Sequence, residues 1–364
     1  MIRVALLGDI AFIGRCDLSK NDNAKDYFSE VAEILSEFDL VIGNLETPFV
    51  TNQKPYKAKS AHIGSDPINV ELLKYLNIDI VTLANNHIYD FGYDSLELTE
   101  DVLTKNEIEY CGINNKVVYK EFDNNKLSVS GFCCYSTNAL GLDKGIDVLN
   151  IEALQKLLSN DKDNEVLSIV NAHFGQEHVH VPNIDHIHMA RMLTSDNDYI
   201  LAGSHPHVLQ GMEMHKKSLL AYSLGNFCFD DVYLNDNRTK VYELNEWNRM
   251  TTILSVTMSK NQIVDYTNIP VHITKSKLSL ANTAILDHLL EYSDALNFSD
   301  ENKYMLERQQ EISKYIAKRK SARDLKWILS RLNFGSVSRI LNIRNNKAKY
   351  ELNITNYLRD EVND

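Results

Sequence analysis

Residues 199–215 read YILAGSHPHVLQGMEMH, an apolar run followed at once by two histidines with a proline between them. Proline has no backbone N–H, so Pro206 does not suit a central strand and indicates that the strand has ended. We expect a strand over 199–204 and, directly after it, a loop that directs His205 and His207 at one point.

Four other strand-like segments end in polar side chains in the same way. In open α/β sheets, ligands bind outside the carboxyl ends of the strands. We therefore expect these side chains to form one site. They are Asp9, Asn44 with Glu46, Asn85 and Asn86 with His87, and His173, and Asp90 and Glu177 follow a few residues later.

Strand and helix patterns alternate along the first three quarters of the chain. This alternation predicts an α/β fold with a mixed sheet, in the form of two sheets packed face to face. Asp66 and Pro67 suit the cap and first position of a helix. The predicted strands are 3–9, 40–46, 78–87, 108–112, 166–175 and 199–204, with a hairpin over 116–135 and antiparallel segments at 219–227, 251–259 and 263–273. The predicted helices are 24–37, 66–77, 94–106, 151–159 and 184–194.

Composition narrows the class of protein. With 364 residues and a net charge of −12, the chain can form a full core and is not expected to bind nucleic acid. No apolar run reaches the roughly 18 residues of a membrane span. The first residues resemble mature structure rather than a signal peptide. Five cysteines at scattered spacings favour reduced thiols and a cytoplasmic protein.

The chain changes character after about residue 275, where long polar helices are expected and no further strand is convincing. We predict a domain over residues 1–272 and a basic helical extension over 273–364. Residues 314–349 contain eleven Lys and Arg against one acid, a net charge of +10 that leaves −22 on the remainder. Three interpretations stay open for this basic segment: docking on the acidic body, binding an anionic lipid or polymer surface, and binding RNA.

The residue types at the strand ends are ligands of divalent transition metals. Carboxylates with neutral imidazoles suit Mn, Fe or Zn, whereas Ca would require oxygen ligands alone. The donors are too many for one tetrahedral site, but they suffice for two ions about 3.5–4 Å apart that share a bridging carboxylate. One or two divalent ions are therefore expected as cofactors.

Six motifs also carry a family resemblance. In order, GDIAFIGR, GNLETP, LANNHIYDFG, HFGQEH, GSHPHVLQG and YSLGNFCFD resemble the motifs of the CapA/PgsA family of capsule and poly-γ-glutamate synthesis proteins. The resemblance covers roughly residues 1–272. It implies the calcineurin-like metallophosphoesterase fold, a four-layer sandwich of two mixed sheets between helices.

The resemblance also implies roles for the residues. Glu46 matches the bridging carboxylate, and His87 matches the histidine that contacts substrate and protonates a leaving group. From its spacing, Asp90 is expected to orient His87. The ligands of one metal are matched by Asn86, His173 and His205, and those of the other by Asp9 and His207. Substrate contacts are expected from Asn44, Arg15, Glu177, Tyr222 and Asn226; for Tyr222 and Asn226, shaping a turn is the alternative.

One departure from the family pattern leaves two functions open. Phosphoesterases of this fold usually begin Asp-x-His, but Ala11 stands two residues after Asp9. The first hypothesis is a metal-dependent hydrolase that acts on a phosphoester or on an amide of an anionic polymer. The second is a non-catalytic accessory factor that binds a polymer or partner enzymes. Relatives often carry an N-terminal membrane anchor, so here we expect peripheral contact with the inner membrane surface through the C-terminal helices.

Overall fold

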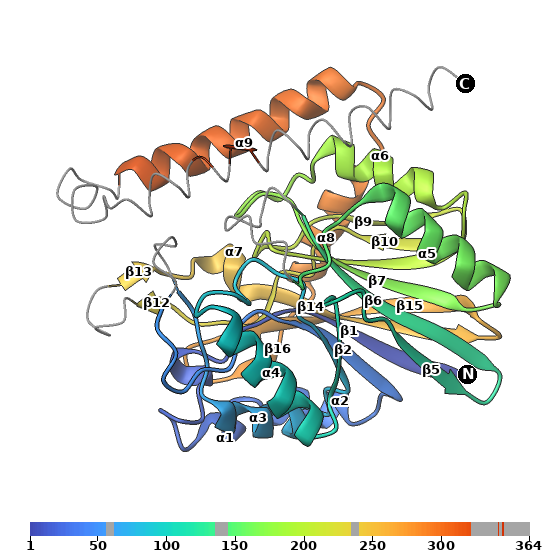
Figure 1. Ribbon diagram of the computed structural model, residues 1–364. Coiled ribbons are helices and arrows are strands. Elements are labelled where there is room, and N and C mark those ends of the chain that lie inside the picture. Colours follow the sequence, from blue (N-terminus) through green and yellow to red (C-terminus); the bar gives the residue numbers. More distant parts are fainter. Residues whose placement is uncertain (56–61, 135–144, 234–239, 322–340, 342–343, 346–364) are drawn as a thin grey trace.

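Two β-sheets pack face to face in the computed structural model, and helices cover their outer faces (Figure 1). The structure describes residues 1–55, 62–134, 145–233, 240–321, 341 and 344–345. The predicted α/β sandwich of two mixed sheets is confirmed.

The first sheet has eight strands in the order β16-β15-β14-β1-β2-β3-β4, with β11 also paired to β1. Strands β1 to β4 and β11 run parallel to one another, whereas β14 pairs antiparallel with β1, β15 with β14 and β16 with β15. The strands are β1 (Ile2–Ile10), β2 (Leu40–Leu45), β3 (Ile80–Thr82), β4 (Glu109–Cys111), β11 (Asn226–Cys228), β14 (Met250–Ser259), β15 (Gln262–Ile273) and β16 (Leu278–Leu280).

The second sheet has six strands in the order β5-β6-β7-β8-β10-β9. Its inner strands β6, β7, β8 and β10 are parallel, and its two edge strands are antiparallel. The strands are β5 (Val118–Phe122), β6 (Asn125–Cys133), β7 (Leu167–His173), β8 (Tyr199–Ser204), β9 (Met212–His215) and β10 (Ser218–Ala221); β12 (Val232–Tyr233) and β13 (Lys240–Tyr242) form a separate pair.

The period of two along each strand divides the core into layers. In β1, Val4 and Leu6 point into the layer between the sheets, and Ala5 and Leu7 point toward the helices. Because both faces of the inner strands are buried, these strands appear in the sequence as continuous apolar runs. All five cysteines lie buried in described segments, and no disulfide joins them.

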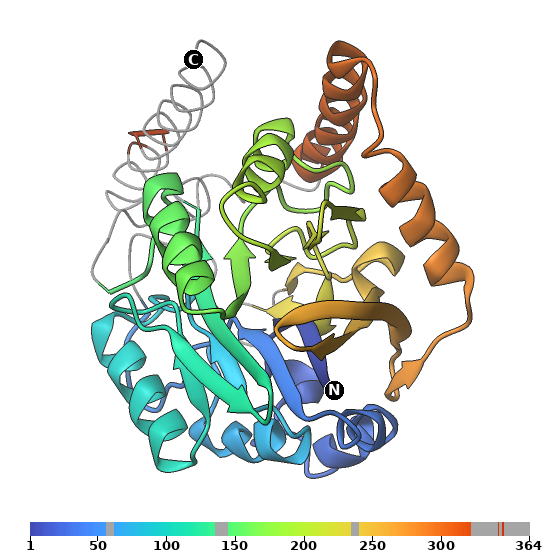
Figure 2. The same cartoon turned by 90° about the vertical axis from the view of Figure 1, so that its right-hand side faces the viewer.

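The helices divide between the two outer faces, as Figure 2 shows from the side. The first sheet is covered by α1 (Ala24–Tyr27), α2 (Ser29–Leu35), α3 (Val70–Tyr75) and α4 (Tyr93–Lys105), and the second by α5 (Ile151–Asp163) and α6 (Ile184–Leu193). The remaining helices are α7 (Glu246–Arg249), α8 (Ala284–Asp294), α9 (Glu301–Ser321) and the 3-10 turns η1 (Gly14–Cys16) and η2 (Pro67–Asn69). Among the described helices, none combines the length and apolarity that crossing a bilayer requires.

Three predictions about elements need correction. The helix expected over 24–37 is interrupted at Phe28, where α1 ends and α2 begins. The segment 219–227 is not one antiparallel strand, because Gly225, at a φ of +71°, lets the chain pass from β10 in the second sheet to β11 in the first. A strand does follow residue 275, since β16 pairs with β15. Most of the basic segment 314–349 lies outside the described residues.

Candidate metal centre and its surroundings

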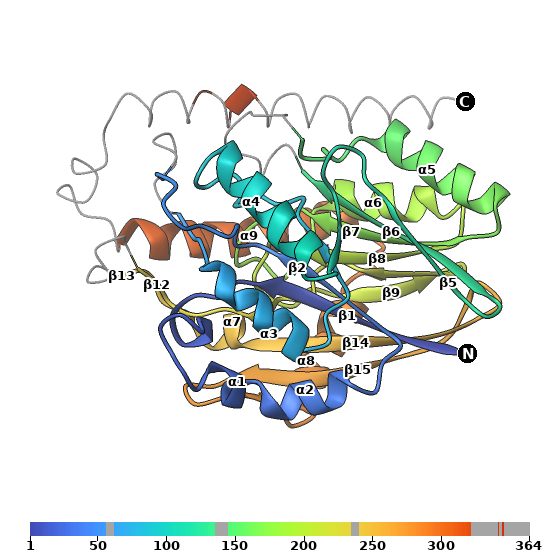
Figure 3. The ribbon, with the colours of Figure 1, turned by 60° about the horizontal axis from the view of Figure 1, so that its bottom comes forward.

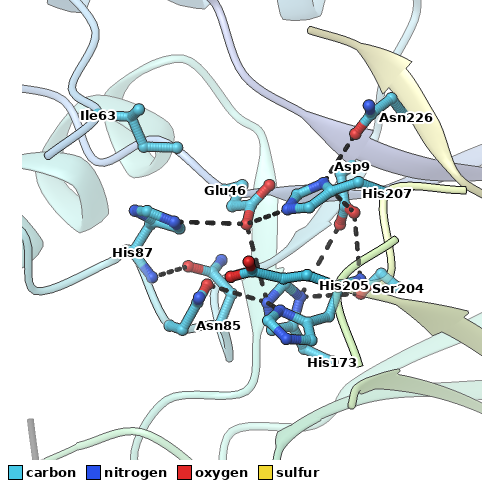
Figure 4. Close-up of polar contacts among 12 residues, drawn as sticks. Asp9, Glu46, Ile63, Asn85, His87, His173, Ser204, His205, His207 and Asn226 are labelled. Atoms are coloured by element: carbon cyan, nitrogen blue, oxygen red, sulfur yellow. Dashed lines mark hydrogen bonds and ion pairs between the residues drawn. The ribbon is translucent and has the colours of Figure 1, made fainter. Parts of the chain in front are cut away.

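Strands from both sheets end at one edge of the sandwich, and the polar side chains that follow them converge there (Figure 4). β1 and β2 contribute Asp9 and Glu46, while β7 and β8 contribute His173 and His205. Figure 3 shows β1 and β2 running beside β7 and β8. The parallel order of the inner strands places all these carboxyl ends together.

Glu46 is fully buried at the centre of the cluster. Its Oε1 lies 3.9 Å from His87 Nε2, 3.8 Å from His173 Nε2 and 3.7 Å from His207 Nε2. These separations are too long for hydrogen bonds. For His173 and His207, they are close to the roughly 3.4 Å that separates two donors bound to one tetrahedral zinc ion. Three imidazoles thus face one carboxylate oxygen.

Asp9 lies next to this group and is also fully buried. The strand register explains its neighbours, because Asp9 is paired with Asn44 on one side and with Asn226 on the other. Its Oδ1 accepts from Asn44 Nδ2 at 2.7 Å, and its Oδ2 accepts from the backbone N–H of His205 at 3.1 Å. His207 Nδ1 lies 3.3 Å from the same Oδ2. Asp9 is therefore held on both sides of its carboxylate.

A second group of donors surrounds His173. Its Nε2 lies 3.0 Å from Asn86 Oδ1 and 3.1 Å from His205 Nδ1. On the other side of the ring, Nδ1 lies 3.0 Å from Ser204 Oγ. The structure thus brings together the three residues that were predicted to bind one metal.

The loop after β8 holds its histidines in an uncommon backbone conformation. His205 has a φ of +94° and His207 a φ of +57°, on either side of Pro206. Non-glycine residues in this region are strained, and such strain gathers at functional sites. Here it lets two histidines that are two positions apart reach the cluster, His205 against His173 and His207 against the carboxylates.

The charges of the two loop histidines differ. Burial lowers the pKa of His205 to about 4. Burial alone would also lower the pKa of His207, but the carboxylates of Glu46 and Asp9 outweigh it and raise this pKa to about 10. The carboxylates thus attract positive charge to this point. Asp9, Glu46 and His207 each offer one donor atom, and these atoms lie within 4.8 Å of one another.

His87 lies at the rim of the cluster and is held by Asp90. The Asp90 carboxylate lies 2.7 Å from His87 Nδ1 and also accepts from the backbone N–H of Ile63 at 2.7 Å. Asp90 is fully buried, whereas the side chain of His87 is 15% exposed. The contact with Asp90 fixes the ring so that Nε2 lies on the side of Glu46.

Two of the residues predicted to contact substrate support other site residues instead. Asn44 donates to Asp9 and lies 3.3 Å from His173 Nδ1, while Asn226 Oδ1 lies 2.8 Å from His207 Nδ1. Both asparagines are buried. They are placed to hold the rings and carboxylates of the donors, because the strand register puts them beside Asp9.

The structure places two other predicted substrate residues elsewhere. The Arg15 guanidinium pairs with Asp230 and donates to Thr274 O at 3.3 Å, and no described contact joins it to the cluster. Tyr222 is fully buried in the core beneath α5 and α6, and its hydroxyl donates to Glu213 at 2.9 Å. The structure thus does not bring Tyr222, which directly follows β10, to the donors of the cluster.

Several residues that hold the site together have no role predicted from the sequence. Asn85 donates to Leu45 O at 2.9 Å and accepts from the backbone N–H of His87 at 3.1 Å, so it joins the loops after β2 and β3. Asn248 donates to His207 O at 2.9 Å. The sequence indicated Asn85 only as one of the polar residues at a strand end, and Asn248 lies in none of the six motifs.

Glu177 lies in the loop after β7, where its Oε2 accepts from the Tyr315 hydroxyl at 3.2 Å. Tyr315 belongs to α9, in the predicted C-terminal extension. The predicted boundary at residue 272 therefore separates two residues that are in contact.

Solved structures resemble the fold only distantly. A hypothetical protein from Thermus thermophilus aligns with a TM-score of 0.48 and 16% identity over 75% of this chain and 100% of its own. A putative 5′-nucleotidase from Staphylococcus aureus aligns with a TM-score of 0.43 and 13% identity over 81% of this chain and 58% of its own.

Two curated relatives are similar in sequence. The PGA biosynthesis protein CapA of Bacillus subtilis (strain 168) is 29% identical over 63% of this chain and 64% of its own length. The capsule biosynthesis protein CapA of Bacillus anthracis is 27% identical over 70% of this chain and 66% of its own length. The matches thus span just under two thirds of these relatives. The model of the family described as bacterial capsule synthesis protein PGA_cap matches residues 3–231, and the chain therefore belongs to this family.

Proposed function

We propose that this protein is a metal-dependent hydrolase of capsule or exopolymer biosynthesis, of the poly-γ-glutamate type, that cleaves a phosphoester or an amide. The observation that carries the proposal is the arrangement around Glu46. One buried carboxylate oxygen is faced by three imidazole nitrogens at 3.7–3.9 Å. Membership in a capsule synthesis family supports the biological setting.

The donor set fits divalent ions of the Mn, Fe or Zn class. Carboxylate oxygens and imidazole nitrogens are the donors that these ions prefer. Asp9 and His173 lie within strands, and the other donors lie in the loops that directly follow strand ends. Asp9, Glu46 and His207 would hold one ion. Asn86, His173 and His205 would hold a second, with Glu46 shared between the two. A divalent ion in this position supplies Lewis acidity and allows water to act as a nucleophile at neutral pH.

His87 is proposed as the general acid. The Asp90 carboxylate accepts a hydrogen bond from the Nδ1–H group, so Nε2 is the ring atom that can carry a proton to a leaving group. The imidazole lies beside the cluster and is not enclosed by it, so 15% of the side chain remains exposed. The backbone N–H of Ile63 donates to Asp90 in turn and holds its carboxylate in place.

One observation favours the alternative of a non-catalytic accessory factor. Ala11 offers no donor where related phosphoesterases have a histidine, and its backbone N–H is bonded to Cys228 O at 2.7 Å. The site near Asp9 thus depends on three protein donors. A protein with this site could bind a polymer or partner enzymes without turnover.

The deciding experiment combines metal analysis with a substrate screen. The full-length protein is purified, its Mn, Fe and Zn contents are measured, and it is tested on phosphomonoesters, phosphodiesters and γ-glutamyl amides. We expect one or two ions and hydrolysis in one class, both lost in Glu46→Ala. Bound metal with no hydrolysis in any class would favour the accessory factor. Absence of metal would overturn the proposal.

We further propose an anionic polymer or phosphoester as the binding partner. The proposed location is the cytoplasm, with peripheral contact at the inner membrane surface through the basic segment 314–349. The segregation of charge supports this, because the segment carries +10 in a chain of −12. Each basic residue near an anionic membrane contributes about 1 kcal/mol of binding.

A further inference from the structure

One face of α9 holds the loop that follows β7. Tyr304, Glu311 and Tyr315 lie on this face, because residues seven and four positions apart share one side of a helix. The Tyr304 hydroxyl donates to Pro182 O at 3.0 Å. Both carboxylate oxygens of Glu311 accept backbone N–H groups, from His180 at 2.8 Å and from Val181 at 3.3 Å. In Figure 2, α8 and α9 lie together at one side of the sandwich.

The third contact of this face reaches the inner part of the loop. The Tyr315 hydroxyl donates to Glu177 at 3.2 Å, and its ring lies 4.9 Å from that of His178. His178 has a φ of +61°, the third left-handed histidine near the cluster. A strained conformation persists only where its surroundings fix it. Here the surroundings are Tyr315 on one side and Tyr242, whose ring stacks at 4.9 Å, on another.

A single amide connects His178 to the candidate metal centre. Asn248 Nδ2 donates to His178 Nδ1 and to His207 O, each at 2.9 Å. The amide orientation is set by two backbone groups, because the His207 carbonyl can only accept and the Asn245 N–H, 3.3 Å from Asn248 Oδ1, can only donate. A continuous series of contacts therefore leads from α9 through His178 and Asn248 to the backbone of His207.

We propose that Glu311 and Tyr315 are positioning residues for the metal donor His207, and that α9 is thus part of the outer shell of the metal centre. The proposal rests on the proposed function only in taking His207 as a metal donor. It assigns a role to a helix that lies beyond residues 3–231, the part that matches the family. Changes to outer-shell partners typically reduce metal affinity or activity about 10–100-fold.

The test uses Mn²⁺ as the probe and the full-length protein. Glu311→Gln keeps the shape of the side chain but replaces one accepting oxygen with an NH₂ group. Tyr315→Phe removes one hydroxyl. The matched control is Tyr119→Phe, because the Tyr119 hydroxyl also donates to a carboxylate, Asp161, at 3.2 Å, but from strand β5. Mn²⁺ affinity is measured by calorimetry, and hydrogen exchange of residues 174–183 by mass spectrometry.

We expect both α9 variants to exchange faster in residues 174–183 and to bind Mn²⁺ about 10-fold more weakly at an unchanged melting temperature. The control should match the wild type in both measurements. Unchanged Mn²⁺ affinity in both α9 variants would overturn this proposal alone. Mn²⁺ binding by a wild type that hydrolyses nothing would overturn only the hydrolase, and a wild type that binds no Mn²⁺ and contains no Fe or Zn would overturn both.

Discussion

Two histidines near Glu46 have different surroundings, and we propose different functions for them. His87 and His173 both lie within 3.9 Å of Glu46, yet their surroundings differ. His173 is buried among other donors, whereas His87 is held by Asp90 at the rim. The same type of side chain is therefore proposed as a ligand in one place and as an acid in the other.

The first prediction separates these two roles. His87→Ala should keep the metal content but reduce turnover by roughly 10²–10⁴, the range of a general acid. His205→Ala should lose metal and activity together, because His205 lies 3.1 Å from His173 within the donor group. Metal analysis beside steady-state kinetics measures both. Equal metal loss in the two variants would mean that His87 is a ligand.

A second prediction concerns His186, which is buried and stacked on Phe174 at 4.4 Å. Burial lowers its pKa from 6.5 to about 3 in the folded protein. The unfolded chain therefore takes up a proton below pH 6.5 while the folded chain does not. Stability should fall with falling pH in this window, by up to about 1.4 kcal/mol per unit. Urea denaturation at pH 7.5, 6 and 5 should show a shallower pH dependence in His186→Leu; parallel profiles would contradict the assignment.

At the scale of elements, the geometry of the site depends on how closely β11 approaches β1. β11 enters the first sheet beside β1, so that Asn226 lies next to Asp9. Gly8 permits this approach, because a Cβ there would lie 2.0 Å from Gly225 O. The position of the backbone at Gly225, and not only the positions of side chains, thus controls the surroundings of Asp9.

The third prediction tests this approach with two glycines of the same sheet. Gly8→Ala should destabilise the fold by about 3 kcal/mol, at the upper end of overpacking costs, because a backbone oxygen cannot move aside. Gly43→Ala should cost about 1 kcal/mol, since its Cβ would meet the tip of the Ile10 side chain, which can rotate away. Chemical denaturation gives both values. Equal costs would show that β11 can shift away from β1.

At the scale of the whole molecule, the charge is unevenly distributed. Residues 314–349 carry +10, and the rest of the chain carries −22. The described part of the extension is attached to the body, through Tyr304, Glu311 and Tyr315 of α9. A test of the basic segment must therefore keep α9, which contains four of its eleven basic residues, and remove the residues after position 321, which contain the other seven.

The fourth prediction compares the full chain with residues 1–321. The full chain should pellet with anionic vesicles at low salt and be released at high salt, because screening weakens each basic contact. The shorter chain should bind much less, and neither should pellet with neutral phosphatidylcholine vesicles. If neither chain pellets with anionic vesicles and the shorter one is only less stable, the segment docks on the body.

The sequence by itself predicted the features that depend on neighbours along the chain. Apolar runs indicated the strands, and Asp66, whose side chain accepts from the Ile68 N–H at 2.9 Å, indicated the start of a helical turn. The polar residues after the strands indicated a shared site, because parallel strands place their carboxyl ends at one edge. These inferences require only local periodicity and a general rule of sheet topology.

Only the tertiary structure decided what each polar side chain contacts. Arg15 is the last residue of a motif of the site, but it is paired with Asp230, 215 positions away along the chain. Asn226 supports His207 because β11 changes sheets at Gly225, and Tyr315 reaches Glu177 from 138 positions away. A hydrogen bond forms wherever a donor and an acceptor meet at about 3 Å. Which groups meet is determined by the packing of distant segments, and no local pattern in the sequence records it.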